Sequence, residues 1–100
     1  MDSVTFALNE SRHRYEITLG DDVVGFSRYR DEGDQRVFLH TEVNPEYQGH
    51  GLATQLIEFS LADGRSQGKR IVAICPMVAA YVKKHHDYDD LLDVTDVKPA

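Results

Sequence analysis

The chain has 100 residues, of which 41% are hydrophobic and 28% charged, and its formal net charge is −6. A chain of this length buries roughly 60–65% of its unfolded surface, so we expect a single domain, residues 1–100, around one core. The negative charge argues against general binding to nucleic acid. No run approaches the ~18 apolar residues of a membrane span, the first residues lack a secretory pattern, and one cysteine excludes an internal disulfide. We therefore expect a cytoplasmic protein without membrane or nucleic-acid partners.

Apolar and β-branched residues predict four strands in the first half of the chain, at 4–8, 15–19, 23–30 and 36–43. Residues typical of turns separate these runs, at 9–11, 20–22 and 31–34. Consecutive strands that are joined by short turns pair as hairpins. The first half of the chain is therefore predicted to form an antiparallel meander.

The apolar period becomes helical after Gly51, and Gly68 is placed to end that helix. A fifth strand is predicted at 70–74, and Pro76 suits the first turn of a second helix. A helix between the fourth and fifth strands makes them parallel, through a right-handed crossover. The predicted fold class is α+β with a mixed sheet. The acidic closing segment, with Leu91, Leu92 and Val94, is predicted to dock on the core as a short strand or helical turn.

The segment from Gln48 to Ala53 joins the fourth strand to the first helix and contains two glycines. Gly49 and Gly51 let the backbone approach an anion, which the free N–H groups and the dipole of the following helix attract. The Gly-Lys-Ser/Thr of a P-loop is absent. A dinucleotide site needs a third small residue, a place that Thr54 fills only loosely, and an acidic residue after the next strand, where Cys75 stands instead. A plain tight turn is the remaining alternative.

This segment also fits the Q/R-x-x-G-x-G/A pattern of the GNAT acetyltransferase superfamily. Val43, Pro45 and Tyr47 fit the flanking pattern V-x-P-x-Y/W-Q/R of the same superfamily. The resemblance extends from about Arg36 to Tyr88. It is closest to a minimal, single-domain subfamily of about this length, which shares the segment 40–43 and a cysteine such as Cys75.

The resemblance implies that acetyl-CoA is the co-substrate and that the fold is GNAT-like. In that superfamily the end of the fourth strand pairs with the pantetheine arm, in a gap between the fourth and fifth strands. Val43 would then direct its N–H group at the thioester oxygen, where negative charge develops. The residues that would hold the pyrophosphate are Gln48, Gly49, His50, Gly51, Leu52 and Ala53.

The glutamate that serves many GNAT enzymes as the base is replaced here by Val37. Strand alternation places His40 and Glu42 on one face, with Leu39, Thr41 and Val43 on the other. His40 and Glu42 could therefore act together to take the proton of an amine. The alternative is that both only form hydrogen bonds to their surroundings, and a bulge in the strand would change the faces.

Two further residues are catalytic candidates. Tyr81 corresponds to a helix tyrosine that protonates the coenzyme thiolate in GNAT proteins. Cys75 precedes a helix, whose N-terminus favours a thiolate, so it could accept the acetyl group and pass it on. Either residue could instead belong only to the core. His85 and His86 do not have the spacing of metal ligands, so no metal is expected.

The sequence leaves two functions open. The first is an N-acetyltransferase that acts on an amine: a protein lysine, an N-terminus or a small amine. The second is a non-catalytic acyl-CoA-binding module or accessory subunit, because the N-terminal helices that form the acceptor groove of larger GNAT proteins are absent from this sequence. An interaction domain that keeps only the fold is a third reading.

Overall fold

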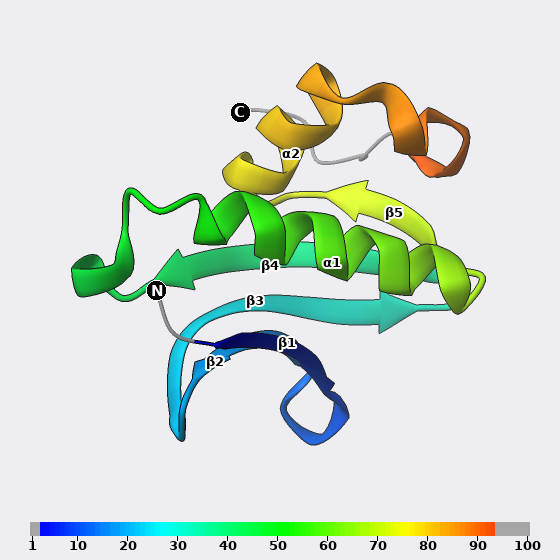
Figure 1. Cartoon of the computed structure of the whole chain (residues 1–100). Coiled ribbons are helices and arrows are strands. Elements are labelled where there is room, and N and C mark those ends of the chain that lie inside the picture. The colour runs from blue at the N-terminus through cyan, green and yellow to red at the C-terminus, as the bar shows by residue number, and fades with distance from the viewer. Residues whose placement is uncertain (1–2, 94–100) are drawn as a thin grey trace.

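The computed structural model describes residues 3–93, which form one five-stranded sheet with two α-helices (Figure 1). The strands lie in the order of the sequence, with three antiparallel pairs followed by one parallel pair between the last two strands. The strands are β1 (Val4–Asn9), β2 (Arg14–Leu19), β3 (Asp22–Glu32), β4 (Gln35–Val43) and β5 (Arg70–Ala73). The predicted α+β class and the parallel last pair are confirmed.

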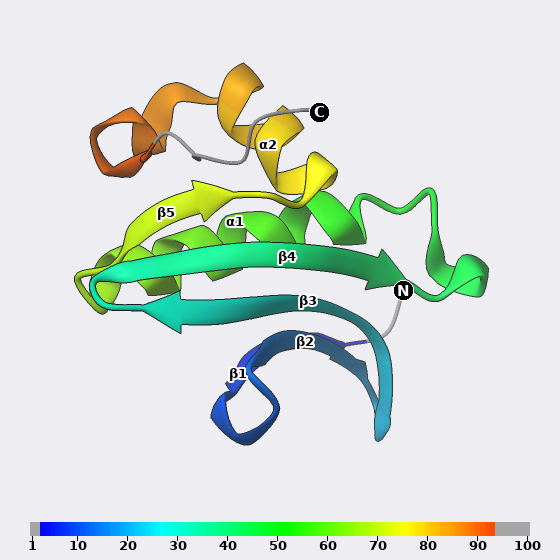
Figure 2. The same cartoon turned by 180° about the vertical axis from the view of Figure 1, so that it is seen from behind.

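Helix α1 (Leu52–Ser66) lies across one face of the sheet, and α2 (Pro76–Lys84) lies beyond β5 (Figure 1). Seen from behind, the strands lie in front of α1, and no helix of residues 3–93 covers this open face (Figure 2). Short 3₁₀ turns follow β1, β4 and α2: η1 (Glu10–Arg12), η2 (Pro45–Tyr47) and η3 (His86–Leu91). Neither helix of the described chain is long and apolar enough to cross a membrane.

One predicted turn is wrong at its start. Asp31 and Glu32 belong to β3, so only Gly33 and Asp34 form the turn. Gly33 supplies the left-handed conformation, with φ 60°, and Glu32 pairs with Gln35 across the hairpin. The pairing of β3 with β4 therefore outweighs the preference of Asp31 and Glu32 for a turn.

A β-bulge at Leu39 changes which side chains of β4 face the helix. His40 pairs with Arg28, and Phe38 pairs with the next residue, Tyr29, so Leu39 has no partner on β3. Phe38 is therefore fully buried in the core together with Thr41 and Val43, and His40 remains exposed. The predicted faces are correct for four residues and wrong for Leu39, which lies outside the core cluster.

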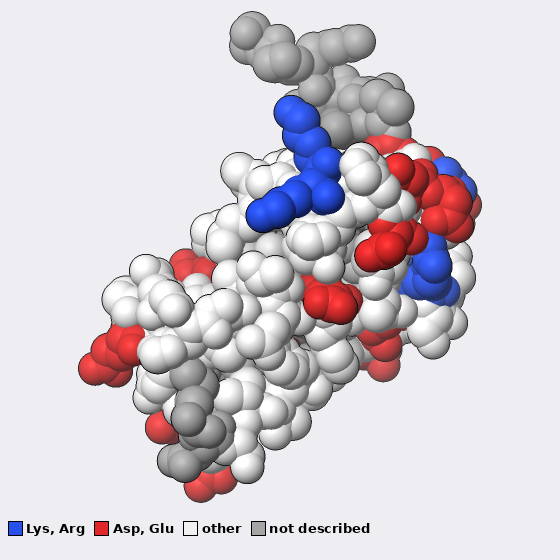
Figure 3. Space-filling view, turned by 45° about the horizontal axis from the view of Figure 1, so that its top comes forward, with Lys and Arg blue, Asp and Glu red and all other residues white. Residues whose placement is uncertain are grey.

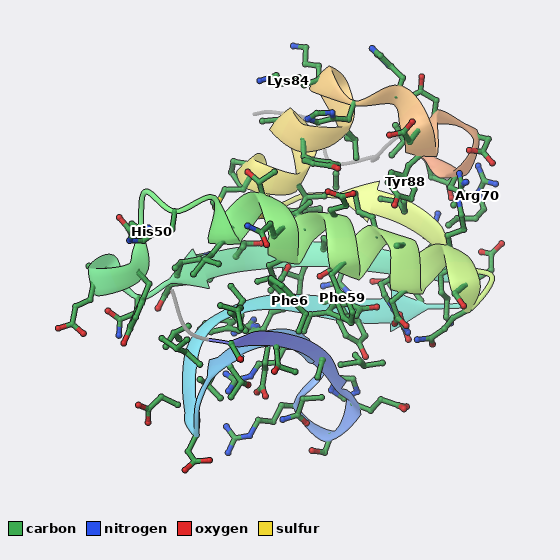
Figure 4. All side chains as sticks on the ribbon, in the orientation of Figure 1. Phe6, His50, Phe59, Arg70, Lys84 and Tyr88 are labelled. Atoms are coloured by element: carbon green, nitrogen blue, oxygen red, sulfur yellow. The ribbon has the colours of Figure 1, made fainter. Side chains whose placement is uncertain are left out.

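The core lies between the sheet and the two helices. Phe6 of β1 stacks on Phe59 of α1, with ring centroids 5.8 Å apart (Figure 4). At the other edge, Tyr88 of η3 is buried, and the Arg65 guanidinium lies 5.0 Å from its ring centroid. Leu92 forms a parallel bridge to Ile71 of β5, so the acidic segment does dock on the sheet. The predicted contact of Val94 lies outside the described residues.

The buried guanidinium of Arg36 joins three strands and α1. Its Nε and Nη2 atoms donate to the two oxygens of Asp31, at 2.8 and 2.9 Å, and Nη1 donates to Tyr15 Oη at 2.7 Å. Tyr15 Oη in turn donates to Asp63 of α1, at 2.7 Å. The guanidinium also lies 4.2 Å from the ring centroid of Tyr29. No buried side-chain polar atom of this network lacks a hydrogen-bond partner, as a buried charge requires.

The hydrogen bonds from Arg36 hold the pKa of Asp31 below its ordinary value. Burial raises the pKa of Tyr15. Both shifts keep the network in the state in which Arg36 and Asp31 are charged and the tyrosine is neutral.

We expect Arg36→Met to lower the free energy of unfolding by about 2–4 kcal/mol, because it leaves the Asp31 carboxylate and the Tyr15 hydroxyl without the donor that Arg36 supplies. The matched control is Arg30→Met in the neighbouring strand, because Arg30 pairs with Glu32 at the surface. That change should cost less than about 1 kcal/mol. Urea unfolding measures both variants, and equal losses would contradict the role assigned to Arg36.

Candidate functional site

The chain between β4 and α1 forms a turn whose backbone is open to an anion. Gly49 and Gly51 have φ values of 85° and 75°, which glycine adopts without strain. Gly51 is the residue that precedes the helix, and it has no side chain that could accept the N–H groups of the first turn. These N–H groups, together with the helix dipole, form the arrangement that binds phosphate in many proteins.

Next to this turn, the outer edge of β4 is open. Asn44 N donates to Val24 O at 2.7 Å, so the backbone N–H and C=O groups of Asn44 point toward β3. Because these directions alternate along a strand, the backbone groups of Glu42 and His40 also point toward β3. The N–H and C=O groups of Thr41 and Val43 therefore point away from β3. On that side β5 extends only as far as Phe38, and no strand of the described chain lies beside β4 beyond it.

A hollow of about 460 Å³ lies where the turn, the edge of β4 and the start of α1 meet. Six of the seven residues predicted to bind the coenzyme line it: Val43, Gln48, Gly49, Gly51, Leu52 and Ala53. His50 does not, and lies on the part of the turn that projects beyond α1 (Figure 4). Gln48 has a structural partner, because its Nε2 donates to Val43 O at 3.0 Å.

The structure adds residues to this hollow that sequence reasoning missed. Tyr47 and Thr54 flank the glycine turn, and Met77 reaches the hollow from α2. Met77 is 41% exposed. Sequence reasoning missed Met77 because this residue is far from the glycine turn along the chain. Only the packing of α2 beside α1 brings Met77 to the turn.

His40 and Glu42 are brought together as predicted. His40 Nε2 lies 3.1 Å from Glu42 Oε1, and both side chains are more than half exposed. They lie on the face of β4 opposite Thr41, next to the ring of Phe26, whose centroid is 6.1 Å from that of His40.

Cys75 lies on the other face of β4, and only 1% of it is exposed. It precedes α2, as predicted, and its Sγ donates to Thr41 Oγ1 at 3.4 Å. The Thr41 hydroxyl is itself 2.9 Å from the Ser27 hydroxyl, which is also buried. The structure therefore places the thiol beside the strand whose edge is open, but on the opposite face from His40.

Tyr81 is separate from this group, because it lines a second hollow between α1 and α2. Burial raises its pKa, and the charge of Glu58 adds to the effect. The ring of His85 lies against the Tyr81 ring in a tilted arrangement, with centroids 4.4 Å apart, and His86 pairs with Asp89 at 3.0 Å. Within residues 3–93, no three potential metal ligands lie close together.

The chain was compared with known proteins by sequence and by structure. Residues 14–91 match the family model of the GCN5-related N-acetyltransferases. No curated protein sequence matches the chain.

Several solved structures share the fold. A GCN5-like protein from Staphylococcus aureus, assigned as an N-acetyltransferase, superposes with a TM-score of 0.71 at 19% identity, over 96% of this chain and 94% of its own. A ribosomal-protein-alanine N-acetyltransferase from Brucella melitensis biovar Abortus 2308 superposes with a TM-score of 0.56 at 22% identity, over 87% of this chain and 66% of its own. An aminoglycoside acetyltransferase from an uncultured soil metagenomic sample superposes with a TM-score of 0.52 at 18% identity, over 93% of this chain and 69% of its own.

Proposed function

Because this chain belongs to the GCN5-related N-acetyltransferase family, we propose that it transfers the acetyl group of acetyl-CoA to an amine. The observation that carries the proposal is the open glycine turn beside the unpaired edge of β4, with a hollow that joins them. One end of this hollow suits an anion and the other suits an extended chain with amide groups. Acetyl-CoA has a pyrophosphate followed by such an amide chain.

In this proposal the pyrophosphate accepts hydrogen bonds from the N–H groups between Gly49 and Ala53. The pantetheine arm lies along Thr41 and Val43 as a short additional strand and pairs with their free N–H and C=O groups. Of these groups, Val43 O is already bonded to Gln48. The N–H of Val43 is therefore the group that we assign to the thioester oxygen, where it stabilises the charge that develops as the amine attacks.

The transfer forms one C–N bond and breaks one C–S bond. The amine nitrogen attacks the thioester carbon, the amine loses a proton, and the coenzyme leaves as a thiolate that takes up a proton. We propose that His40 accepts the amine proton and that the Glu42 carboxylate, 3.1 Å away, stabilises the resulting imidazolium. Because both lie on the open face, the amine would approach β4 from the side that no described helix covers.

A second route passes through Cys75, and its contact with Thr41 is the observation that favours it. The Cys75 thiolate would attack the thioester carbon and release the coenzyme thiolate. The amine would then attack the acetyl-cysteine carbon and lose a proton, and Cys75 would leave as a thiolate, while the released coenzyme thiolate takes up a proton. This route requires the buried thiol to become accessible at the edge of β4.

A module that binds acyl-CoA without catalysis is the alternative function. It is favoured by Val37, which stands where many GNAT enzymes have their base and is only 3% exposed. The two functions share the coenzyme site, so binding and turnover must be measured separately.

We expect acetyl-CoA at about 100 times its dissociation constant to stabilise the protein by about 2.7 kcal/mol, a rise in melting temperature on the order of 10 °C. Amide NMR signals of Gly49 to Ala53 should shift in the same titration. Pantetheine, which lacks the pyrophosphate, should give little of either effect.

The variant Gly51→Ala tests the turn itself, and Gly20→Ala is its matched control. Both glycines have left-handed backbones, with φ values of 75° and 63°, so both substitutions introduce similar strain. Only the methyl group at Gly51 would lie in front of the first turn of α1, so only that variant should lose affinity. If wild-type protein does not respond to acetyl-CoA, both the enzyme and the binding module are excluded.

We expect His40→Ala and Glu42→Gln each to slow transfer to an amine by about 10²-fold, the scale of a positioned acid or base. Coenzyme affinity should not change in His40→Ala, because His40 does not line the coenzyme hollow, whereas Glu42 does, so coenzyme affinity is measured alongside the rate for both variants. Steady-state rates over a range of pH measure the effect, and Thr5→Ala, exposed on β1 at the far edge of the sheet, is the control. Unchanged rates in both variants would remove the pair from the mechanism.

Mass spectrometry after incubation with acetyl-CoA tests the Cys75 route. That route predicts one added acetyl group on Cys75, and a Cys75→Ala protein that binds CoA but has lost transfer. Full transfer by Cys75→Ala, with no acetylated wild-type protein, would show that the thiol only packs and that the amine attacks the thioester directly.

A further inference from the structure

The open face of the sheet carries two neighbouring rows of side chains that differ in charge. The first row contains the acidic residues, and its members pair across β2, β3 and β4: Glu16, Phe26 and Glu42. The second row is basic and pairs across the same strands: Arg14, Arg28 and His40. The residues between the two rows are buried, so both rows lie on the open face: Tyr15, Ser27 and Thr41. Because the rows are two residues apart along each strand, about 7 Å separates them.

The acidic row adjoins the proposed coenzyme site. Glu42 lines the hollow at the glycine turn, and together with Phe26 it also lines a smaller hollow of about 210 Å³ beside β3. Glu16 is already paired with Arg14, at 2.6 Å, so Glu42 is the acidic residue of this row that an acceptor would meet. A protonated amine that approaches the thioester from the open face is therefore attracted to Glu42.

Beyond the basic row lies a hollow of about 480 Å³, which we call the arginine hollow. Its charged and titratable lining residues come from η1, β3 and the residue between them and β2: Arg12, His13, Arg28, Arg30 and Asp31. Leu39, the residue at the bulge of β4, also lines it. Since Leu39 precedes His40 and Arg28 pairs with His40, the arginine hollow begins next to the proposed base.

Two of the arginines in this hollow are not neutralised by the described part of the chain. Arg12 and Arg28 are exposed, and none of the ion pairs among residues 3–93 involves them. Arg30 pairs with Glu32. Asp31 is bound by Arg36 at 2.8 Å and lies 3.8 Å from Lys69, so its charge is already compensated. The arginine hollow therefore favours an anionic ligand.

The charge of the arginine hollow is opposite to that of the chain, whose net charge is −6. On the side of the molecule that Figure 3 shows, the lysines and arginines lie over α2 and toward η3. The cations of the arginine hollow belong to other elements, η1 and β3. They form a separate basic surface, which the proposed coenzyme site does not use.

We propose that the acceptor is a peptide with a free N-terminal amine followed by acidic residues, and that the arginine hollow binds these acidic side chains. The inference rests on the proposed function. With the amine at Glu42, the basic row lies about 7 Å further along the sheet. An extended peptide advances about 3.4 Å per residue, so its third to fifth residues lie over Arg28 and the arginine hollow.

The shape of the face favours a peptide over a small amine. No helix of residues 3–93 covers the strands on this side, so an extended chain can lie flat across them (Figure 2). An α-amine also suits an exposed base, because its ordinary pKa of about 7.7–8.0 is lower than that of a lysine.

Arg28 is the residue of the basic row that we assign to specificity. Arg14, in the same row, is held by Glu16 and lies 4.8 Å from the ring centroid of Phe26. His40 is assigned to the amine proton. Arg28 therefore distinguishes peptides by the charge that follows the amine, and Arg12 extends this contact to the next acidic residue.

Steady-state acetylation of three peptides tests the preference. The peptides begin with the same two alanines and differ only at residues three to five, which are all glutamate, all glutamine or all lysine. Wild-type protein should have a kcat/KM about tenfold higher for the glutamate peptide than for the glutamine peptide, the scale of two exposed charge-assisted contacts. The lysine peptide should be slower than both. Salt at about 0.5 M should remove most of the difference, since it screens exposed charges.

The variants Arg28→Gln and Arg12→Gln should each lower the glutamate-to-glutamine ratio to about three, and the double variant should bring it close to one. Lys83→Gln is the matched control, because it removes the same charge from an exposed position on α2 that does not line the hollow. It should keep the wild-type ratio. A ratio of one in wild-type protein, or a ratio that survives the double variant, would overturn the assignment of the arginines.

Binding is measured separately from transfer with the N-acetylated glutamate peptide, which has no free amine. It should shift the amide NMR signals of residues 12–13 and 28–31, and the N-acetylated glutamine peptide should not. Absence of these shifts would overturn the inference. If the shifts occur but no free amine is ever acetylated, the proposed function falls, and the arginine hollow remains a binding site for acidic peptides.

Discussion

The carbonyl group of Phe38 is the point at which the sheet ends and the site begins. It accepts hydrogen bonds from Ile74 N at 3.1 Å and from Cys75 N at 2.8 Å, the two residues that follow β5. Since one carbonyl takes both donors, the chain leaves the sheet there, and Pro76 then starts α2. The five residues of β4 beyond Phe38 keep an open edge as a result. The hollow, the position of Cys75 and the groove between the helices all depend on this divergence.

At the opposite end of the sheet, a buried network of charged and polar groups holds the strands and α1 together. Arg36 lies two residues before Phe38, and its guanidinium holds β2, β3 and α1 against β4 through Tyr15, Asp31 and Asp63. Such a network is costly unless every group has a partner, and here every buried polar atom of the described residues has one. Strand β4 is therefore held in place where the network lies and has an open edge where the site lies.

The site itself is formed largely from backbone groups. No lysine or arginine lines the hollow at the glycine turn, so an anion there would be held by N–H groups and the dipole of α1. This arrangement suits a protein with a net charge of −6, because fixed dipoles favour a phosphate locally without making the whole surface basic.

The sequence by itself determined the order of the strands, both helices and the glycine turn, because these depend on local patterns: alternation, helical spacing, and glycine or proline at fixed places. It also determined that His40 and Glu42 share a face, since residues two apart in a strand do so unless a bulge lies between them. Only the tertiary structure decided that the bulge falls at Leu39, because a bulge is set by the register with β3. The sequence indicates only that Arg36 belongs to a strand. Its buried network with β2, β3 and α1 depends on how these elements pack around it. The groove between the helices is lined by Met77, Tyr81 and Lys84, and it forms only because α2 packs beside α1. Such contacts between distant segments leave no periodic signal in the sequence.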